Sequence, residues 1–207
     1  MSELLRTAPL YLVCGTEELQ VLDPALRGGV RIVQLRVKGA DARQSIVESA
    51  SYFRRLCTRH RALLIINDHA ELVERTGADG VHLGQDDMQV ERARELLGPD
   101  RVIGLSTHSP EQIDAAGDQP VDYIGVGPVF ATPTKPGRPA VGVELVGYAA
   151  EHARMPFFAI GGITPDNVDA VRDAGAHGVA VVRALTEADD PFNAAMRLAQ
   201  GAQVGAT

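Results

Sequence analysis

The sequence contains no tryptophan, only two cysteines, and few aromatic side chains, which make up 4% of its 207 residues. It has no run of about 18 consecutive apolar residues, the length that a membrane helix needs. Its first residues also lack the basic segment and apolar stretch that mark a secretory signal. Cys14 and Cys57 fit neither a CxxC pattern nor a metal-ligand spacing. These absences predict a cytoplasmic protein with reduced thiols and no membrane partner.

Basic side chains are fewer than acidic ones, and the formal net charge is −7. Nucleic acids and anionic membranes bind surfaces with an excess of basic residues, so neither is an expected partner. Lysine is especially scarce, because 18 of the 20 basic residues are arginine and only Lys38 and Lys135 are lysine. An ammonium group is a compact charge on a flexible stem, whereas a guanidinium suits a fixed bidentate partner. We therefore expect both lysines to contact one phosphoryl ligand, with chance placement as the alternative.

Eight short segments rich in Val, Ile and Leu recur along the chain. They cover residues 10–14, 31–37, 62–67, 80–84, 101–106, 123–127, 156–162 and 178–182. Because they are almost continuously apolar, they are typical of strands buried on both faces of a parallel sheet. Helical patterns lie between them. Residues 42–57 place Ile46 and Phe53 on one apolar stripe, and Ser109 and Thr164, each followed by proline, are expected helix caps.

This regular alternation over 207 residues predicts one α/β domain, a single (β/α)8 TIM barrel that covers residues 1–207. Residues 201–207 are expected to be a frayed tail. An open doubly wound sheet is the alternative, but the spacing stays even and no segment resembles a second domain or a sheet edge. Functional groups of a (β/α)8 barrel lie at the carboxyl ends of its strands.

Glycines follow the seventh predicted strand, at Gly161 and Gly162, while Val182 and Arg183 follow the eighth. The loops after strands seven and eight form a recurrent phosphate site in this fold, and glycine lets backbone N–H groups approach an anion closely. The sequence therefore predicts a phosphate site here. A simple turn at the two glycines is the alternative.

Carboxylates follow two neighbouring predicted strands, at Asp68 and Asp87. Adjacent strands lie about 5 Å apart, so both carboxylates can converge on one ion. Two oxygen ligands, with water and phosphate in the other positions, suit Mg²⁺ better than zinc. A helix-capping role for Asp68 is an equally good interpretation of the spacing. A glycosidase pair is less favoured, because few aromatic side chains are available to stack on a sugar.

The 16 residues from Gly127 to Gly142 contain four prolines and no apolar periodicity. Loops of this length in compact domains are usually lids or binding loops. Thr132 and Thr134 offer hydroxyl donors there, and Lys135 offers a positive charge. Among the histidines, His82 lies inside a strand pattern and is interpreted as a hydrogen-bonded core residue.

Motifs at the strand ends form a series: QLRVK at 34–38, IIND at 65–68, HLGQDD at 82–87, GLSTHS at 104–109, GPVFATPTK at 127–135, AIGGI at 159–163 and GVAVVRAL at 178–185. In this order and spacing they resemble the thiamine-phosphate synthase family over nearly the whole chain. The resemblance implies a transferase of thiamine biosynthesis that joins hydroxymethylpyrimidine diphosphate to thiazole phosphate, or to its carboxylated form. Diphosphate is released, thiamine phosphate is formed, and Mg²⁺ is the cofactor. In that family the pyrimidine is thought to ionise first, and the thiazole nitrogen then captures the cation.

Site residues follow from the resemblance by position. The pyrimidine diphosphate is expected to bind Gln34, Arg36, Lys38, Asn67, Ser106 and Lys135. Catalysis is expected to depend on Arg36, Lys38, Ser106 and Lys135. Mg²⁺ is expected to bind Asp68 and Asp87. The thiazole phosphate is expected to bind Thr132, Thr134, Gly162, Val182 and Arg183. The expected partners are these small molecules, and the sequence is also compatible with a homo-oligomer.

Two other functions stay open at this point. The thiazole tautomerases, a sister group on the same barrel, lack the metal-binding aspartate after the asparagine and carry a catalytic histidine where this chain has Pro128. A non-catalytic sensor of phosphorylated ligands would need no ion at a leaving group. Asp68 and Asp87 together favour the synthase over both. One departure from the family pattern is Arg183, at a position where many members have serine.

Overall fold

The computed structural model describes residues 2–132 and 139–200, and its strands close into a parallel barrel in which β1 pairs with both β2 and β8. The strands are β1 Leu10–Cys14, β2 Ile32–Leu35, β3 Leu63–Asn67, β4 Gly80–Leu83, β5 Val102–Thr107, β6 Tyr123–Val126, β7 Phe157–Ile160 and β8 Gly178–Val181. Each falls within or next to an expected segment. Closure confirms the predicted (β/α)8 fold and excludes the open sheet.

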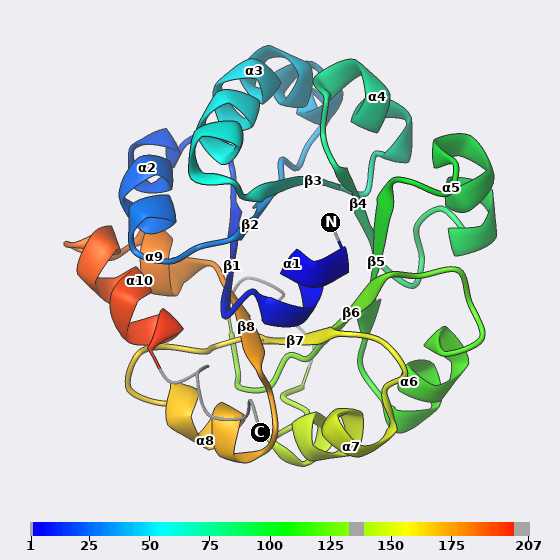
Figure 1. The fold of residues 1–207 in the computed structure, drawn as a ribbon, viewed down its shortest axis with the longest axis vertical. Helices are drawn as coiled ribbons and strands as arrows, with labels where there is room; N and C mark the ends of the chain where they lie inside the picture. Colours follow the sequence, from blue (N-terminus) through cyan, green and yellow to red (C-terminus); the bar gives the residue numbers. More distant parts are fainter. Residues whose placement is uncertain (1, 133–138, 201–207) are drawn as a thin grey trace.

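Helices other than α1 surround the ring of strands, as Figure 1 shows. The helices are α1 Ser2–Thr7, α2 Leu19–Arg27, α3 Ala42–His60, α4 Val73–Thr76 with the 3-10 turn η1 Ala70–Leu72 before it, α5 Val90–Leu97, α6 Pro110–Ala116, α7 Glu144–His152, α8 Val168–Asp173, α9 Arg183–Thr186 and α10 Pro191–Ala199. Among residues 2–132 and 139–200, no helix combines the length and apolar character needed to cross a membrane.

One of the two expected caps is confirmed. Ser109 precedes α6, and its side chain accepts a hydrogen bond from the backbone N–H of Gln112. Thr164 does not cap α8, which begins at Val168 with Asn167 at its N-cap. The Asn167 side chain instead accepts a hydrogen bond from the Thr164 N–H at 2.8 Å, and this closes a turn before the helix. The prediction for Thr164 was therefore wrong, because a turn at residues 165–167 precedes the helix, and the Thr164 hydroxyl accepts a hydrogen bond from the Asp166 N–H at 3.3 Å within that turn.

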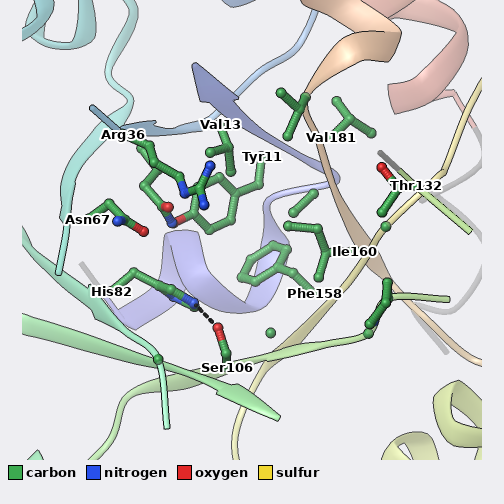
Figure 2. Close-up of a pocket in the computed structure, with 18 of the residues that line it drawn as sticks. Tyr11, Val13, Arg36, Asn67, His82, Ser106, Thr132, Phe158, Ile160 and Val181 are labelled. Carbon is green, nitrogen blue, oxygen red and sulfur yellow. Dashed lines mark hydrogen bonds between the residues drawn. The ribbon is translucent and has the colours of Figure 1, made fainter. Parts of the chain in front are cut away.

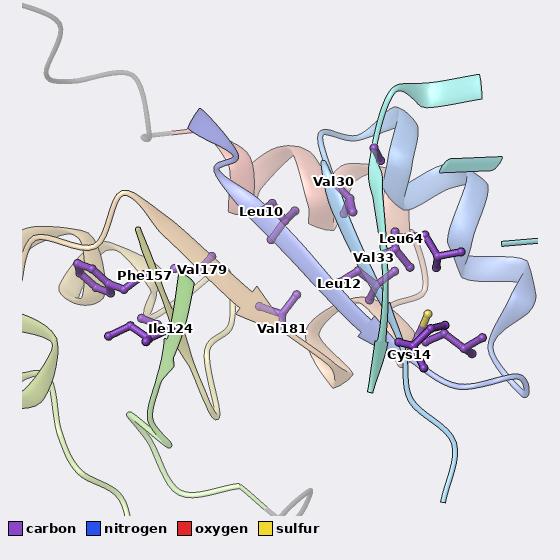
Figure 3. Packing of buried hydrophobic residues seen from close by; sticks show 14 of the residues in the cluster. Leu10, Leu12, Cys14, Val30, Val33, Leu64, Ile124, Phe157, Val179 and Val181 are labelled. Carbon is purple, nitrogen blue, oxygen red and sulfur yellow. The ribbon is translucent and has the colours of Figure 1, made fainter. Parts of the chain in front are cut away.

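The outer core lies between the strands and the helices. Alternate residues of β1, Leu10, Leu12 and Cys14, point outward into this layer, where they belong to one apolar cluster with residues of the surrounding helices (Figure 3). Burial raises the pKa of the Cys14 thiol well above its usual value and that of Cys57 to about 12. Both thiols are free and protonated, as expected for structural cysteines.

The inner core fills the barrel itself. Tyr11, Tyr123 and Phe158 are almost fully buried inside it, and the Phe158 ring packs edge-on against both tyrosines at centroid distances of 5.4 and 5.7 Å. The short helix α1 lies across the amino end of the barrel in Figure 1, and its Leu5 joins this inner cluster. The amino half is therefore filled with apolar side chains, which leaves the carboxyl half for a site.

We predict that Gly104→Ala destabilises the protein, because an added Cβ would lie 2.1 Å from Cζ of Tyr123. The ring cannot move aside, since Tyr11 and Phe158 pack against it. Overpacking of this kind costs about 1–3 kcal/mol, and for a domain of this size each kcal/mol lowers the melting temperature by about 2–4 °C. Thermal unfolding measures the change.

Gly147→Ala in α7 is the matched control. Its added Cβ would lie 3.9 Å from the nearest atom, the carbonyl oxygen of Ala174. Alanine is the better helix former, so this variant should be as stable as the wild type or more stable. Equal melting temperatures for Gly104→Ala and the wild type would contradict the packing argument.

Candidate active site

A cavity of about 340 Å³ lies at the carboxyl ends of the strands (Figure 2). Its walls bring together all the expected site residues that the structure describes: Gln34, Arg36, Lys38, Asn67, Asp68, Asp87, Ser106, Thr132, Gly162, Val182 and Arg183. The two other expected residues, Thr134 and Lys135, lie outside the described residues. One enclosed space thus holds residues from the ends of seven strands and the loops that follow them.

Asp68 and Asp87 form a carboxylate pair at the rim of this cavity. Asp68 follows β3 with a φ of 63°, a left-handed conformation that is uncommon for a side chain other than glycine. The turn after it begins at Ala70 with His69 at the N-cap and no side-chain cap, so Asp68 does not cap a helix. The Asp87 carboxylate accepts a hydrogen bond from the Gly84 N–H at 2.7 Å.

The electrostatics of this pair are unfavourable in the protein alone. The pKa of the Asp68 carboxyl is raised to about 6, first by partial burial and then by the neighbouring Asp87 carboxyl, while the Arg36 charge acts in the opposite direction. Two close carboxylates repel each other when both are ionised. A bound cation would relieve this repulsion.

The donor set fits a hard divalent cation. The two carboxylates offer oxygen ligands, and Mg²⁺ commonly takes only one or two carboxylates from a protein, with water and phosphate oxygens in its other positions. Within residues 2–132 and 139–200 there is no cluster of three or more His, Cys, Asp or Glu side chains that could hold a metal ion. The described part of the cavity therefore lacks the four protein ligands that a structural zinc site needs.

Arg36 supplies a positive charge to the cavity wall. Its guanidinium is more than half buried, and this burial lowers its pKa, which the charge of Asp68 partly restores. An arginine starts from so high a pKa that it stays charged in proteins. Lys38, two residues after Arg36 in the chain, lines the same cavity. The site therefore offers cations for an anionic group next to carboxylates for a metal.

The opposite wall is formed by the segments that follow β7 and β8, which are neighbours in the barrel. Gly161 and Gly162 have φ values of 107° and 65°, and a Cβ at Gly161 would lie 2.5 Å from Cα of Pro128. These glycines are therefore needed for the turn and for close packing against the segment after β6. Arg183, on the facing segment, pairs with Glu187 of its own helix at 3.7 Å.

Two histidines that the sequence analysis did not assign to the site also line the cavity. His82 projects from β4 to the cavity floor, where its Nε2 lies 2.9 Å from the Ser106 hydroxyl (Figure 2). His108 follows β5, and its Nδ1 is hydrogen-bonded to the carbonyl oxygen of Gly127. The signal for His82 was weak, because a histidine within an apolar strand pattern is usually a core residue. Its position in HLGQDD, before Asp87, was the available clue.

The family model and the most similar relatives share one family. The family model described as thiamine monophosphate synthase matches residues 10–185. Thiamine-phosphate synthase from Acidothermus cellulolyticus is 48% identical over 206 residues, which cover 96% of this chain and 97% of that protein. The enzyme of the same name from a Nostoc species is 48% identical over 91% of this chain, but the chain spans only 54% of that relative's length. The solved structure of thiamine phosphate pyrophosphorylase from Pyrococcus furiosus matches with a TM-score of 0.87 and 30% identity, over 97% of this chain and 99% of that chain.

We predict that Asp87→Asn stabilises the metal-free protein near neutral pH. Asparagine keeps an oxygen that can accept the Gly84 hydrogen bond, but it removes one of the two repelling charges. An acid whose pKa is raised by folding costs stability once it is ionised, so the gain should be present above pH 6 and shrink as the pH falls towards 5. Solvent screening limits the gain to about 1 kcal/mol or less, or about 2–4 °C in melting temperature.

The measurement is thermal unfolding in the presence of a chelator at several pH values. Asp86→Asn is the control, since it removes the same charge from the exposed neighbouring residue. If both variants shift the melting temperature equally at every pH, repulsion within the pair is not the cause.

Proposed function

Because the chain belongs to the thiamine monophosphate synthase family, we propose that it is a thiamine-phosphate synthase that joins hydroxymethylpyrimidine diphosphate to thiazole phosphate or its carboxylated form. The observation that carries this proposal is the combination, in one cavity, of a half-buried cation at Arg36 with the carboxylate pair Asp68 and Asp87. Such a combination suits a diphosphate leaving group that is bound together with a divalent metal.

In this reaction the bond between the pyrimidine methylene carbon and the diphosphate oxygen breaks, and both electrons leave with the oxygen. The lone pair of the thiazole nitrogen then forms the new bond to the same carbon. With the thiazole phosphate itself no proton has to move, whereas the carboxylated form would also lose its carboxyl group as CO2 and take up a proton at that carbon. No protein nucleophile is required for the bond formation in either case. The protein must therefore hold two ligands in line and stabilise the charge that develops on the leaving oxygen.

The chain's own side chains divide this work. Arg36 and Lys38 line the same cavity as the carboxylate pair, so they are the groups that we assign to the diphosphate, together with Lys135 of the segment outside the described residues. Charges act more strongly in a half-buried site than in water. Gln34, Asn67 and Ser106 are largely buried polar groups deeper in the cavity, and we assign them to the pyrimidine ring.

Asp68 and Asp87 are the residues that would hold Mg²⁺. When bound, the ion would act as a Lewis acid that neutralises charge on the leaving diphosphate. The raised pKa of Asp68 supports this assignment, because a carboxylate pair that is costly without a cation gains most from one.

The thiazole phosphate is assigned to the opposite wall. Gly162, Val182 and Arg183 lie there on neighbouring segments, with Thr132 beside them at the end of the described part of its loop. Thr134 belongs to the same assignment by its position in the sequence. The tautomerase and sensor functions are less well supported, since neither needs the carboxylate pair, and Pro128 occupies the tautomerase histidine position.

The first test is incubation of the purified protein with the pyrimidine diphosphate, the thiazole phosphate and Mg²⁺, with and without a chelator. Thiamine phosphate is detected by oxidation to fluorescent thiochrome. We expect product that the chelator abolishes, and Asp87→Asn should lose most of the activity. Isomerisation of a thiazole phosphate without pyrimidine diphosphate would favour a tautomerase. No turnover of any kind would favour a sensor.

The second test concerns Arg36. We expect Arg36→Gln to lower kcat by about 10²–10³, the range for removal of one group that stabilises developing charge. Arg36→Lys should recover part of the loss, because the charge is restored without the planar fork. If Arg36→Gln raised only KM and left kcat unchanged, Arg36 would bind the substrate and the transition state equally well.

A further inference from the structure

Beneath the cavity, five polar side chains from five strands form a continuous hydrogen-bonded chain. Gln34 Nε2 donates to the Tyr11 hydroxyl at 2.6 Å, and that hydroxyl lies 2.9 Å from the hydroxyl of Tyr123. The Tyr123 hydroxyl in turn lies 2.9 Å from His82 Nδ1, and His82 Nε2 lies 2.9 Å from the Ser106 hydroxyl. The chain therefore links two residues assigned to the pyrimidine, Gln34 and Ser106, through three residues that have no assigned role.

The middle of the chain is rigid and closed to solvent. The exposed fraction is 2% for Tyr11 and 0% for Tyr123, and each ring packs edge-on against Phe158. Burial raises the pKa of both phenols well above its usual value, so both hydroxyls keep their protons. A buried hydroxyl must donate a hydrogen bond to a neighbour, since an unpaired buried polar group destabilises the fold.

One glycine makes room for the chain. A Cβ at Gly104 would lie 2.5 Å from the Tyr123 hydroxyl oxygen. Gly104 is inside a strand, where glycine lacks a side chain to pack and weakens the sheet. Its position beside the Tyr123 ring therefore indicates that the barrel interior is arranged around this side chain.

The proton of each member fixes the direction of the next hydrogen bond. Because the Tyr11 oxygen accepts from Gln34, its own proton goes to Tyr123. The Tyr123 proton then goes to His82 Nδ1, so the neutral imidazole carries its proton on Nε2 and donates to the Ser106 oxygen. The Ser106 proton is left to point into the cavity. At the other end, the Gln34 amide is turned so that Oε1 is its free acceptor; among the described residues, none donates to that oxygen.

We propose that this chain sets the ligand specificity of the cavity floor, with Tyr11, Tyr123 and His82 as positioning residues that act through Gln34 and Ser106. The two ends of this chain then offer a ligand one acceptor, Gln34 Oε1, and one donor, the Ser106 hydroxyl. An aminopyrimidine edge matches this pair, because it offers an N–H donor beside an unprotonated ring nitrogen. An oxopyrimidine edge offers a carbonyl beside a ring N–H, which is the reverse order. The choice of these two ring edges rests on the proposed function, whereas the direction of the chain does not.

The direction of the chain can be measured without any activity. In protein labelled with ¹⁵N on histidine, the ring nitrogen shifts distinguish the Nε2–H from the Nδ1–H tautomer, and His82→Asn assigns the signals of His82. We expect the Nε2–H tautomer in the wild type at slightly alkaline pH. The Nδ1–H tautomer would mean that the chain runs in the opposite direction, which would overturn the proposal.

Specificity is tested with Tyr11→Phe, Tyr123→Phe and the double variant. The readout is the ratio of kcat/KM for the aminopyrimidine diphosphate to kcat/KM for its oxo analogue. The wild type should strongly prefer the amino compound, because the oxo compound leaves buried polar groups mispaired. Each single variant frees the Gln34 amide to rotate and should lower this ratio about ten- to a hundredfold. The double variant should lower it no further, since both changes break the same chain.

Tyr148→Phe is the matched control. It removes a phenolic hydroxyl that donates to Asp114 at 2.8 Å on the exposed face of α7, far from the cavity. This variant should leave the ratio unchanged. If both compounds lose kcat/KM equally in Tyr11→Phe, the chain has only a structural role and the proposal fails. If the wild type turns over neither compound, the proposed function fails, and the His82 tautomer still decides the direction of the chain.

Discussion

Closure of the sheet is the constraint on which the rest of the structure depends. Once β1 is bonded to both β2 and β8, the barrel has a fixed width, and every inward side chain must fit the space that its neighbours leave. Tyr123 and Phe158 are too large for a uniform lining, so the strands beside them supply glycine at the same level, Gly104 beside Tyr123 and Gly178 beside Phe158. The positions of the polar groups at the cavity floor follow from this packing and not from flexible loops. The outer helices complete the burial of the strands but leave the floor unchanged.

The two ends of the barrel differ in polarity, and this difference separates stability from chemistry. The amino half is apolar and is covered by α1 through Leu5. The carboxyl half carries the carboxylate pair and the half-buried Arg36. In the absence of a ligand, the partial burial of these charges lowers the free energy of unfolding. The apolar half offsets that cost, as is typical of enzymes whose active sites are strained or electrostatically unfavourable.

Much of this arrangement could be predicted from the sequence, because continuous apolar segments and strand-end motifs are local signals. The barrel, its strands and the cavity shared by the strand-end residues could be predicted from these signals. Thr164 failed as a cap because a turn at residues 165–167 delays the start of α8 to Val168, and the Thr164 hydroxyl accepts the Asp166 N–H of that turn instead. The left-handed conformation of Asp68 has no sequence signal, since glycine does not mark it. His82 could not be recognised as part of a chain, because its partner Tyr123 is 41 residues away and only the closed sheet brings them together.

The cover that α1 forms over the amino end also determines how molecules reach the cavity. With that end filled by Leu5 and the inner cluster, the route to the floor runs past the rim at the carboxyl ends of the strands. A ligand seated against Gln34 and Ser106 therefore lies beneath any ligand held by the outer loops. In the part of the chain that the structure describes, ligands would enter and leave past this rim, so a ligand at the floor would bind before one at the rim and leave after it.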